Sequence, residues 1–203
     1  MDAGNATLNG ADLSGADLAR AAMAQSRLKG AKLQTARLGG ANLFRADLSD
    51  ADLTGAFMDG ASLGQSDLRR AKLAGASMRG ADLSDSDLGS ASLQGAIMTD
   101  ALLVGADLTW TVLHRADLRG AKVAGDLNGT DLSDADLRGA DLSGANCEFV
   151  ILGGADVSDA NFTGANLQRA NLVGTKGHRA CFDRAKMFYS RPGNADFQGA
   201  SFR

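Results

Sequence analysis

A motif of five residues repeats along this chain from one end to the other, and its period limits what the chain can fold into. The motif reads Ala-Asp-Leu followed by two variable residues, as at 11–15, 16–20, 46–50 and 51–55. A period of five matches neither the 3.6 residues of an amphipathic helix nor the two of a half-buried strand. A coil with flat sides and regular corners does place every Leu on one inner surface.

We call the Leu position the centre of each five-residue unit. Centres fall every five residues from Leu8 to Val123 and again from Leu127 to Phe202, because one residue is missing between Val123 and Leu127. The centre is mostly Leu and the residue two before it is mostly Ala, so one large and one small side chain per unit would fill a narrow interior. Gly recurs two residues after the centre, where it frees the backbone to turn a corner.

This A(D/N)LXX pattern resembles the pentapeptide-repeat family over essentially the whole chain. The resemblance implies an all-β fold, a right-handed quadrilateral parallel β-helix with four units in each coil and about ten coils. We therefore expect a single domain over residues 1–203, with a one-residue phase slip at 124–126. We also expect irregular coils at 175–194, because Gly177 at a centre leaves the interior unfilled and Pro192 at a centre lacks a backbone donor.

Position within the twenty-residue coil assigns each outward residue to one of four faces. On the face whose centres begin with Leu8 and Leu28, the residue before the centre is Asp in five consecutive coils. We call these residues the acidic column: Asp47, Asp67, Asp87, Asp107 and Asp126. Carboxylates about 4.8 Å apart repel one another, which predicts that some of them titrate above their ordinary range.

The acidic column has two interpretations. The first is structural, because Asp and Asn precede the centre on every face and their short side chains bond local backbone groups. The second is DNA mimicry, since the resemblance implies that some family members inhibit or protect type II topoisomerases such as DNA gyrase with an acidic face. Charge density argues against mimicry, because the formal net charge is only −3 whereas duplex DNA carries one charge per roughly 1.7 Å. The same low charge argues against direct nucleic-acid binding.

A second exterior feature is apolar. Trp110, Phe149 and Tyr189 each stand two residues after a centre of that same face, and Phe188 adjoins Tyr189; we call these four residues the aromatic edge. Exposed aromatic residues along one edge predict a contact with a protein partner. Four aliphatic residues around the fifth and sixth coils are also outward by register: Ile97, Leu102, Val104 and Val112.

Nothing in the sequence indicates an enzyme, and we expect no catalytic residue, metal or cofactor. An interior packed with Leu and Ala offers no concavity for convergent titratable groups. His178 and Cys181 lie three residues apart, which permits a nucleophilic dyad on paper, but the spacing of the histidines matches no metal site. No apolar run is long enough to cross a membrane and no signal peptide is recognisable, so the cytoplasm is the expected location.

These observations favour a non-enzymatic rod that acts as an interaction or scaffold module for a protein partner. The resemblance implies two alternatives: a DNA-mimicking modulator of DNA gyrase, active in inhibition or in quinolone or toxin protection, and a repeat segment of a bacterial secretion-system adaptor or effector. Neither end of the array carries an obvious cap, and an uncapped solenoid exposes strand edges. An end-to-end homodimer is therefore a further expectation.

Overall fold

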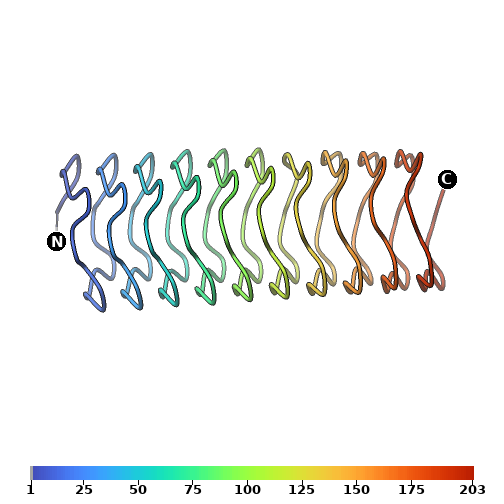
Figure 1. The fold of residues 1–203 in the computed structure, drawn as a ribbon, viewed down its shortest axis with the longest axis horizontal. Coiled ribbons are helices and arrows are strands. Elements are labelled where there is room, and N and C mark those ends of the chain that lie inside the picture. The colour runs from blue at the N-terminus through green and yellow to red at the C-terminus, as the bar shows by residue number, and fades with distance from the viewer. Residues whose placement is uncertain (1) are drawn as a thin grey trace.

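The backbone winds into a stack of coils (Figure 1), and parallel β-bridges join successive coils along four sides. The computed structural model describes residues 2–203. The residue before each centre bridges the residue twenty positions further on, as in the series from Asp47 to Asp67 to Asp87. The centre Leu48 donates its N–H to Asp67 of the next coil at 2.7 Å, and Asp67 donates back to Ala46 at 3.0 Å. The parallel β-helix predicted from the period of five is confirmed.

Each side of a coil contributes only one bridging residue, so no strand within residues 2–203 extends beyond a single bridge, and no helix is present there. The bridges run from Asp2, paired with Ala22, to Ser201, paired with Cys181. We name the faces after their early centres, each followed at twenty-residue steps by the others of its column: the Leu8, Leu13, Leu18 and Met23 faces. Coils are counted by the centres of the Leu8 face.

A four-residue turn closes every regular corner. At the corner after Leu48, for example, the carbonyl of Leu48 accepts the N–H of Ala51 at 3.0 Å. The third residue of the turn has a positive φ, between 55° and 74° along the chain, as in a type II turn. Gly fills many of these positions because it lacks a Cβ, yet Asp, Arg and aromatic residues adopt the same φ at others. The corner therefore accepts side chains that project from the rod.

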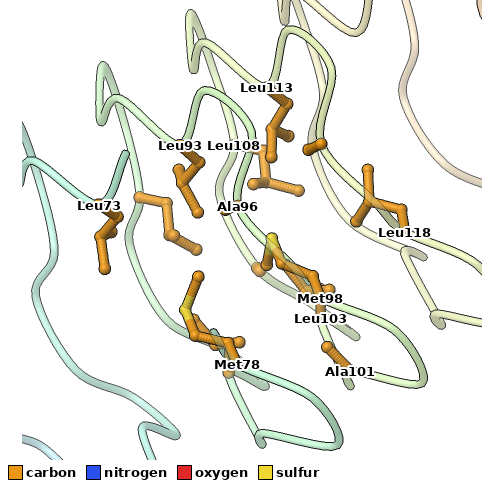
Figure 2. Packing of buried hydrophobic residues seen from close by; sticks show 14 of the residues in the cluster. Leu73, Met78, Leu93, Ala96, Met98, Ala101, Leu103, Leu108, Leu113 and Leu118 are labelled. Carbon is orange, nitrogen blue, oxygen red and sulfur yellow. The ribbon is translucent and has the colours of Figure 1, made fainter. Parts of the chain in front are cut away.

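The interior is a column of large centres alternating with small residues. Figure 2 shows Met78 and Met98 in successive coils of one column, with Leu73 and Leu93 beside them. These centres are fully buried, as are the Ala residues two positions before them. Burying a Leu side chain stabilises a fold by about 1.5–3 kcal/mol, so a solenoid this thin depends on the centre being filled in nearly every unit.

The phase slip removes a corner residue and leaves the ladder intact. Bridges that span it join residues nineteen apart, from Asp107 with Asp126 to Lys122 with Asp141, and the interval of twenty then resumes. Gly125 takes the inward place that Ala holds elsewhere, and its N–H does not close the usual turn. Only Gly fits there, because a Cβ would lie 2.3 Å from the carbonyl oxygen of Ala106. The stack shows no visible bend (Figure 1).

The irregular coils predicted at 175–194 are absent, because the ladder continues there without interruption. Lys176 bridges Asp196, and the Gly177 N–H donates to Asp196 at 2.7 Å. Space beside Gly177 is filled by the Phe197 ring, which would lie 2.5 Å from a Cβ on Gly177. Pro192 removes no bond of the described ladder, since a centre N–H donates to the following coil and Pro192 lies in the last coil of residues 2–203.

Phenylalanine replaces Leu at the centres near the C-terminal end of the described stack. Phe182 stacks on Phe162 with ring centroids 5.1 Å apart and on Phe202 at 5.0 Å. Phe197 meets Phe182 edge to face at 5.3 Å. These contacts explain how the final coils keep their register despite a Gly at one centre.

Candidate partner-binding surfaces

The acidic column lies in one line along the Leu8 face, as predicted, and its carboxylates bind the backbone of their own coils. The Oδ1 atom of each accepts the N–H two residues further on, at 2.9–3.0 Å. Asp82 and Asp131 make the same bond on other faces. The structural interpretation therefore accounts for these aspartates wherever they occur.

Arginine side chains neutralise part of the acidic column. Arg69 donates to both carboxylate oxygens of Asp67, and its Nε lies 3.5 Å from Asp87. Hydrogen bonding from Arg69 lowers the pKa of Asp67 below its ordinary value. The prediction that repulsion within the acidic column raises the pKa is therefore wrong for Asp67. Arg70 binds Asp50 in the same way, at 2.7 Å.

No face of the rod is strongly acidic. When each corner residue is assigned to the face before it, the outward positions of the Leu8 face hold seven acidic and six basic side chains. The other three faces each carry a net charge of 0 or −1. Acidic and basic residues are thus interleaved along every face, and a surface imitating the phosphates of duplex DNA would require a large excess of acids.

The aromatic edge is exposed at the corner between the Leu8 and Leu13 faces. Trp110 is 64% exposed and Tyr189 82% exposed, and Phe149 and Phe188 are exposed as well. Trp110, Phe149 and Tyr189 all hold the positive φ of the third turn position, at 57°, 58° and 61°. This conformation costs an ordinary residue about 1–2 kcal/mol, so three bulky residues occupy positions where Gly would be more stable.

The aromatic rings of the sixth and eighth coils each contact a residue of the next coil. The indole of Trp110 covers Gly129, whose missing side chain leaves room for it. The guanidinium of Arg169 lies 5.2 Å from the centroid of the Phe149 ring and binds Glu148 at 3.4 Å. The rings are thereby held against the rod, and their remaining area faces solvent.

Aliphatic residues widen the aromatic edge onto the Leu13 face. Val112 follows Trp110 by two residues, and Ile151 follows Phe149 by two; both are partly exposed, as is Val173. Ile151 and Val173 were missed in the sequence, although the register that identified Val112 places Ile151 in the same column two coils further on. The structure assigns Leu102 and Val104 to the Met23 face and leaves Ile97 half-buried on the Leu18 face, so these three do not join the edge.

A comparison with family models connects this architecture with known proteins. The model for pentapeptide repeats matches in 8 copies, over residues 4–45, 46–85, 61–100, 91–125, 126–159 and 158–188. The chain belongs to the pentapeptide-repeat family. A comparison with curated proteins gave no match.

Solved pentapeptide-repeat proteins resemble this one at low identity. HetL, involved in heterocyst differentiation regulation in the cyanobacterium Nostoc sp. strain PCC 7120, is 29% identical, with 100% of this chain and 89% of HetL covered and a TM-score of 0.39. Trypsin-treated QnrB1, a plasmid-mediated fluoroquinolone resistance protein, is 20% identical, with 87% and 89% covered and a TM-score of 0.38. A thylakoid lumen protein from Arabidopsis thaliana is 28% identical, with 59% and 70% covered and a TM-score of 0.22.

The two residues that could have formed a nucleophilic dyad, His178 and Cys181, lie on different faces of this pentapeptide-repeat protein. His178 binds Asp196 at 2.8 Å on the Leu18 face, whereas Cys181 lies on the Met23 face with its sulfur 3.2 Å from the Thr163 hydroxyl. The two therefore do not form the dyad that their spacing permitted. Among residues 2–203, no three His, Cys, Asp or Glu side chains gather as a metal site, and no helix is long and apolar enough to span a membrane. A hollow of about 320 Å³ lies beside Arg37 and Phe57, away from the aromatic edge.

Proposed function

We propose that this pentapeptide-repeat protein is a non-enzymatic binding rod that holds a protein partner along its aromatic edge. The observation that supports this most strongly is the alignment of Trp110, Phe149 and Tyr189 on one corner, each in a backbone conformation that favours Gly. A residue that costs stability and exposes apolar area is best explained by a contact outside the chain.

Composition supports the same proposal. Trp110 and Tyr189 are the only Trp and Tyr of the chain, and Glu148, which lies against the edge, is the only Glu. The repeat elsewhere reuses a small set of residues, whereas the single Trp, Tyr and Glu all lie at or beside this corner. Trp, Tyr and Arg are also the residue types that most often dominate binding at protein interfaces.

In the experiment, three purified, tagged rods are each incubated with an extract of the source cell, and the proteins that each rod captures are compared. The first is the native rod, the second carries Trp110→Ala and Phe149→Ala, and the third carries Phe57→Ala and Leu102→Ala, which remove exposed apolar area from other faces. The proposal expects one set of proteins to bind the first and third rods and to be lost from the second. Equal capture by all three would refute it.

A DNA-mimicking modulator of DNA gyrase is the alternative function, and the continuous line of five aspartates is the observation that favours it. Two observations weigh against it: basic side chains lie among the aspartates of the Leu8 face, and the aspartate carboxylates accept hydrogen bonds from backbone N–H groups. A supercoiling assay decides between the two functions. Inhibition or drug protection by the native rod, lost in a variant with Asp67→Lys, Asp87→Lys and Asp107→Lys, would establish the mimic.

A further inference from the structure

The three corner aromatics are evenly spaced along the rod. Trp110 lies in the sixth coil, Phe149 in the eighth and Tyr189 in the tenth, with Gly129 and Arg169 at the same corner of the coils between them. Adjacent coils are about 4.8 Å apart, so the steps are roughly 10 Å each. A line of three equally spaced rings is superposed on itself by a two-fold axis through the middle one.

We propose that the aromatic edge joins two copies of this chain side by side, with the rods antiparallel and the two-fold axis passing beside Phe149. This inference rests on the proposed function, in which the edge is the binding surface, and it names the partner as a second copy. Phe149 would meet Phe149 of the partner subunit, and Trp110 would meet Tyr189 of the partner subunit. A contact of this kind is isologous, so it closes on itself and stops at a dimer.

Apolar and small residues lie where the two copies would come closest. Ile151 stands beside Phe149 in the eighth coil, and Gly153 further along the same face has no side chain to hold the copies apart. Val112 beside Trp110 extends the apolar strip toward the sixth coil. The contact would thus have an apolar centre with polar groups at its margin, as stable interfaces do.

Charges at the margin are also compatible with this two-fold axis. The axis opposes the sixth coil to the tenth and the seventh to the ninth, and it keeps each face against its own copy. Asp107 of the sixth coil then faces Lys186 of the tenth, and Asp126 of the seventh faces the uncharged Asn166 of the ninth.

Two charges beside the edge on the Leu13 face oppose uncharged residues across the axis. On the Leu13 face, Asp131 faces Asn171 and Arg191 faces Val112. Glu148 alone faces its own copy, and each Glu148 is already paired with Arg169 of its own chain. One pair of opposite charges, Asp107 and Lys186 of the partner subunit, thus meets across the contact, and complementarity of this kind favours one partner over others.

Cross-linking tests the geometry. In a Cys181→Ser background, which leaves only the buried Cys147, single cysteines are placed at the edge and treated with a short bismaleimide. Phe149→Cys alone should give linked dimers. Trp110→Cys and Tyr189→Cys should each give none alone and linked dimers when mixed. Phe57→Cys, on another face, is the matched control and should give none.

Light scattering of the uncrosslinked protein completes the test. The native rod should have twice the mass of one chain, and Phe149→Arg should halve it, while Phe57→Arg should leave it unchanged. A native monomer at hundreds of micromolar would overturn the inference, and so would a dimer that Phe149→Cys does not link, which is the result expected of end-to-end pairing. If the native rod is a monomer and Trp110→Ala with Phe149→Ala still abolishes partner capture, the proposed function stands and only the homodimer is refuted.

Discussion

The indole of Trp110 rests on Gly129 of the next coil, so closely that a Cβ on Gly129 would lie 2.6 Å from Cε3 of the indole. Gly129→Ala should therefore displace the ring. It should also cost about 1–2 kcal/mol, because Gly129 has a φ of 68°. Trp110 is the only Trp of the chain, so its fluorescence emission reports the displacement directly as a red shift.

Gly139→Ala is the matched control for this prediction. Gly139 has the same turn position and a φ of 69°, but a Cβ there meets nothing within 4 Å. The control should lose similar stability in thermal unfolding while its Trp emission stays native. A shift of equal size in both variants would mean that the emission reports general loosening of the rod and not the contact with Gly129.

The phase slip predicts an unusual pair of variants. Gly125→Ala should destabilise the rod by about 3 kcal/mol or more, because the added Cβ meets the backbone carbonyl of Ala106, which cannot move aside as a flexible side chain would. Inserting an Ala between Gly125 and Asp126 adds the same methyl group but restores the missing corner residue. This second variant should unfold at or above the native temperature in a calorimetric scan. A large loss in the insertion variant would show that the tightened corner is itself required.

Gly177 and Phe197 share one space in the interior, so their substitutions should not be additive. Gly177→Leu introduces the commonest centre residue of the repeat, yet it should cost about 1–3 kcal/mol because the Phe197 ring already fills the site. Adding Phe197→Leu should recover most of that loss, although Phe197→Leu alone should be destabilising. The free energies of unfolding of the four proteins measure the coupling. Simple addition of the two single effects would contradict the shared packing.

The two cysteines should differ in reactivity. Burial raises the pKa of the Cys147 thiol to about 12, whereas Cys181 is partly exposed. Because the thiolate is the reactive form, iodoacetamide at neutral pH should label Cys181 and spare Cys147 in the native rod, and should label both in denaturant. Mass spectrometry of the labelled protein measures this. Native labelling of Cys147 would indicate that the eighth coil opens.

Acid should weaken the rod through its paired aspartates. Hydrogen bonds from Arg119 lower the pKa of Asp117, and those from Arg138 lower the pKa of Asp136. A carboxylate with a lowered folded pKa stabilises the fold above its unfolded value of about 3.9, and this contribution is lost as the pH falls through the folded pKa. The unfolding temperature should thus hold steady from pH 7 to 5 and fall below about pH 4.

The Arg119→Gln variant distinguishes the contribution of the Asp117 pair to acid sensitivity from that of other groups. Without the Arg119 side chain, Asp117 loses the side-chain hydrogen bonds that most lower its pKa and keeps the backbone one, so the fall in unfolding temperature between pH 4 and 2 should be shallower than in the native protein. Arg115→Gln is the control, since Arg115 takes part in no ion pair of the described residues. Identical acid profiles for all three proteins would assign the acid sensitivity to other groups.

Much of this molecule was predictable from its period. The inward centres, the corner after each and the exposure of Trp110 and Tyr189 all depend on register alone, which a sequence states directly. Contacts between coils were not predictable. The ring of Phe197 filling the space at Gly177, the indole over Gly129 and the pairing of Arg69 with two aspartates depend on the direction that a side chain takes across coils. The repeat period alone does not determine these directions.

The phase slip shows a further limit of register. The spacing of the centres shows that one residue is missing between Val123 and Leu127, but it does not show whether a corner residue or an inward residue has been lost. The structure shows that the corner residue is missing, because Gly125 occupies the inward place, where a Cβ would collide with the Ala106 carbonyl. A regular corner, by contrast, admits a side chain.

The third turn position carries Trp, Phe, Tyr, Arg, Asp and Gly at nearly the same φ. The backbone at these corners therefore keeps one conformation whichever residue it carries, although that conformation favours Gly, and successive corners recur at a fixed interval of about 4.8 Å. The rod is in this sense a molecular ruler with four graduated edges. Chemical groups placed at chosen corners would be held at set distances from one another, which makes the same scaffold suitable for recognising any partner whose own features repeat along a line.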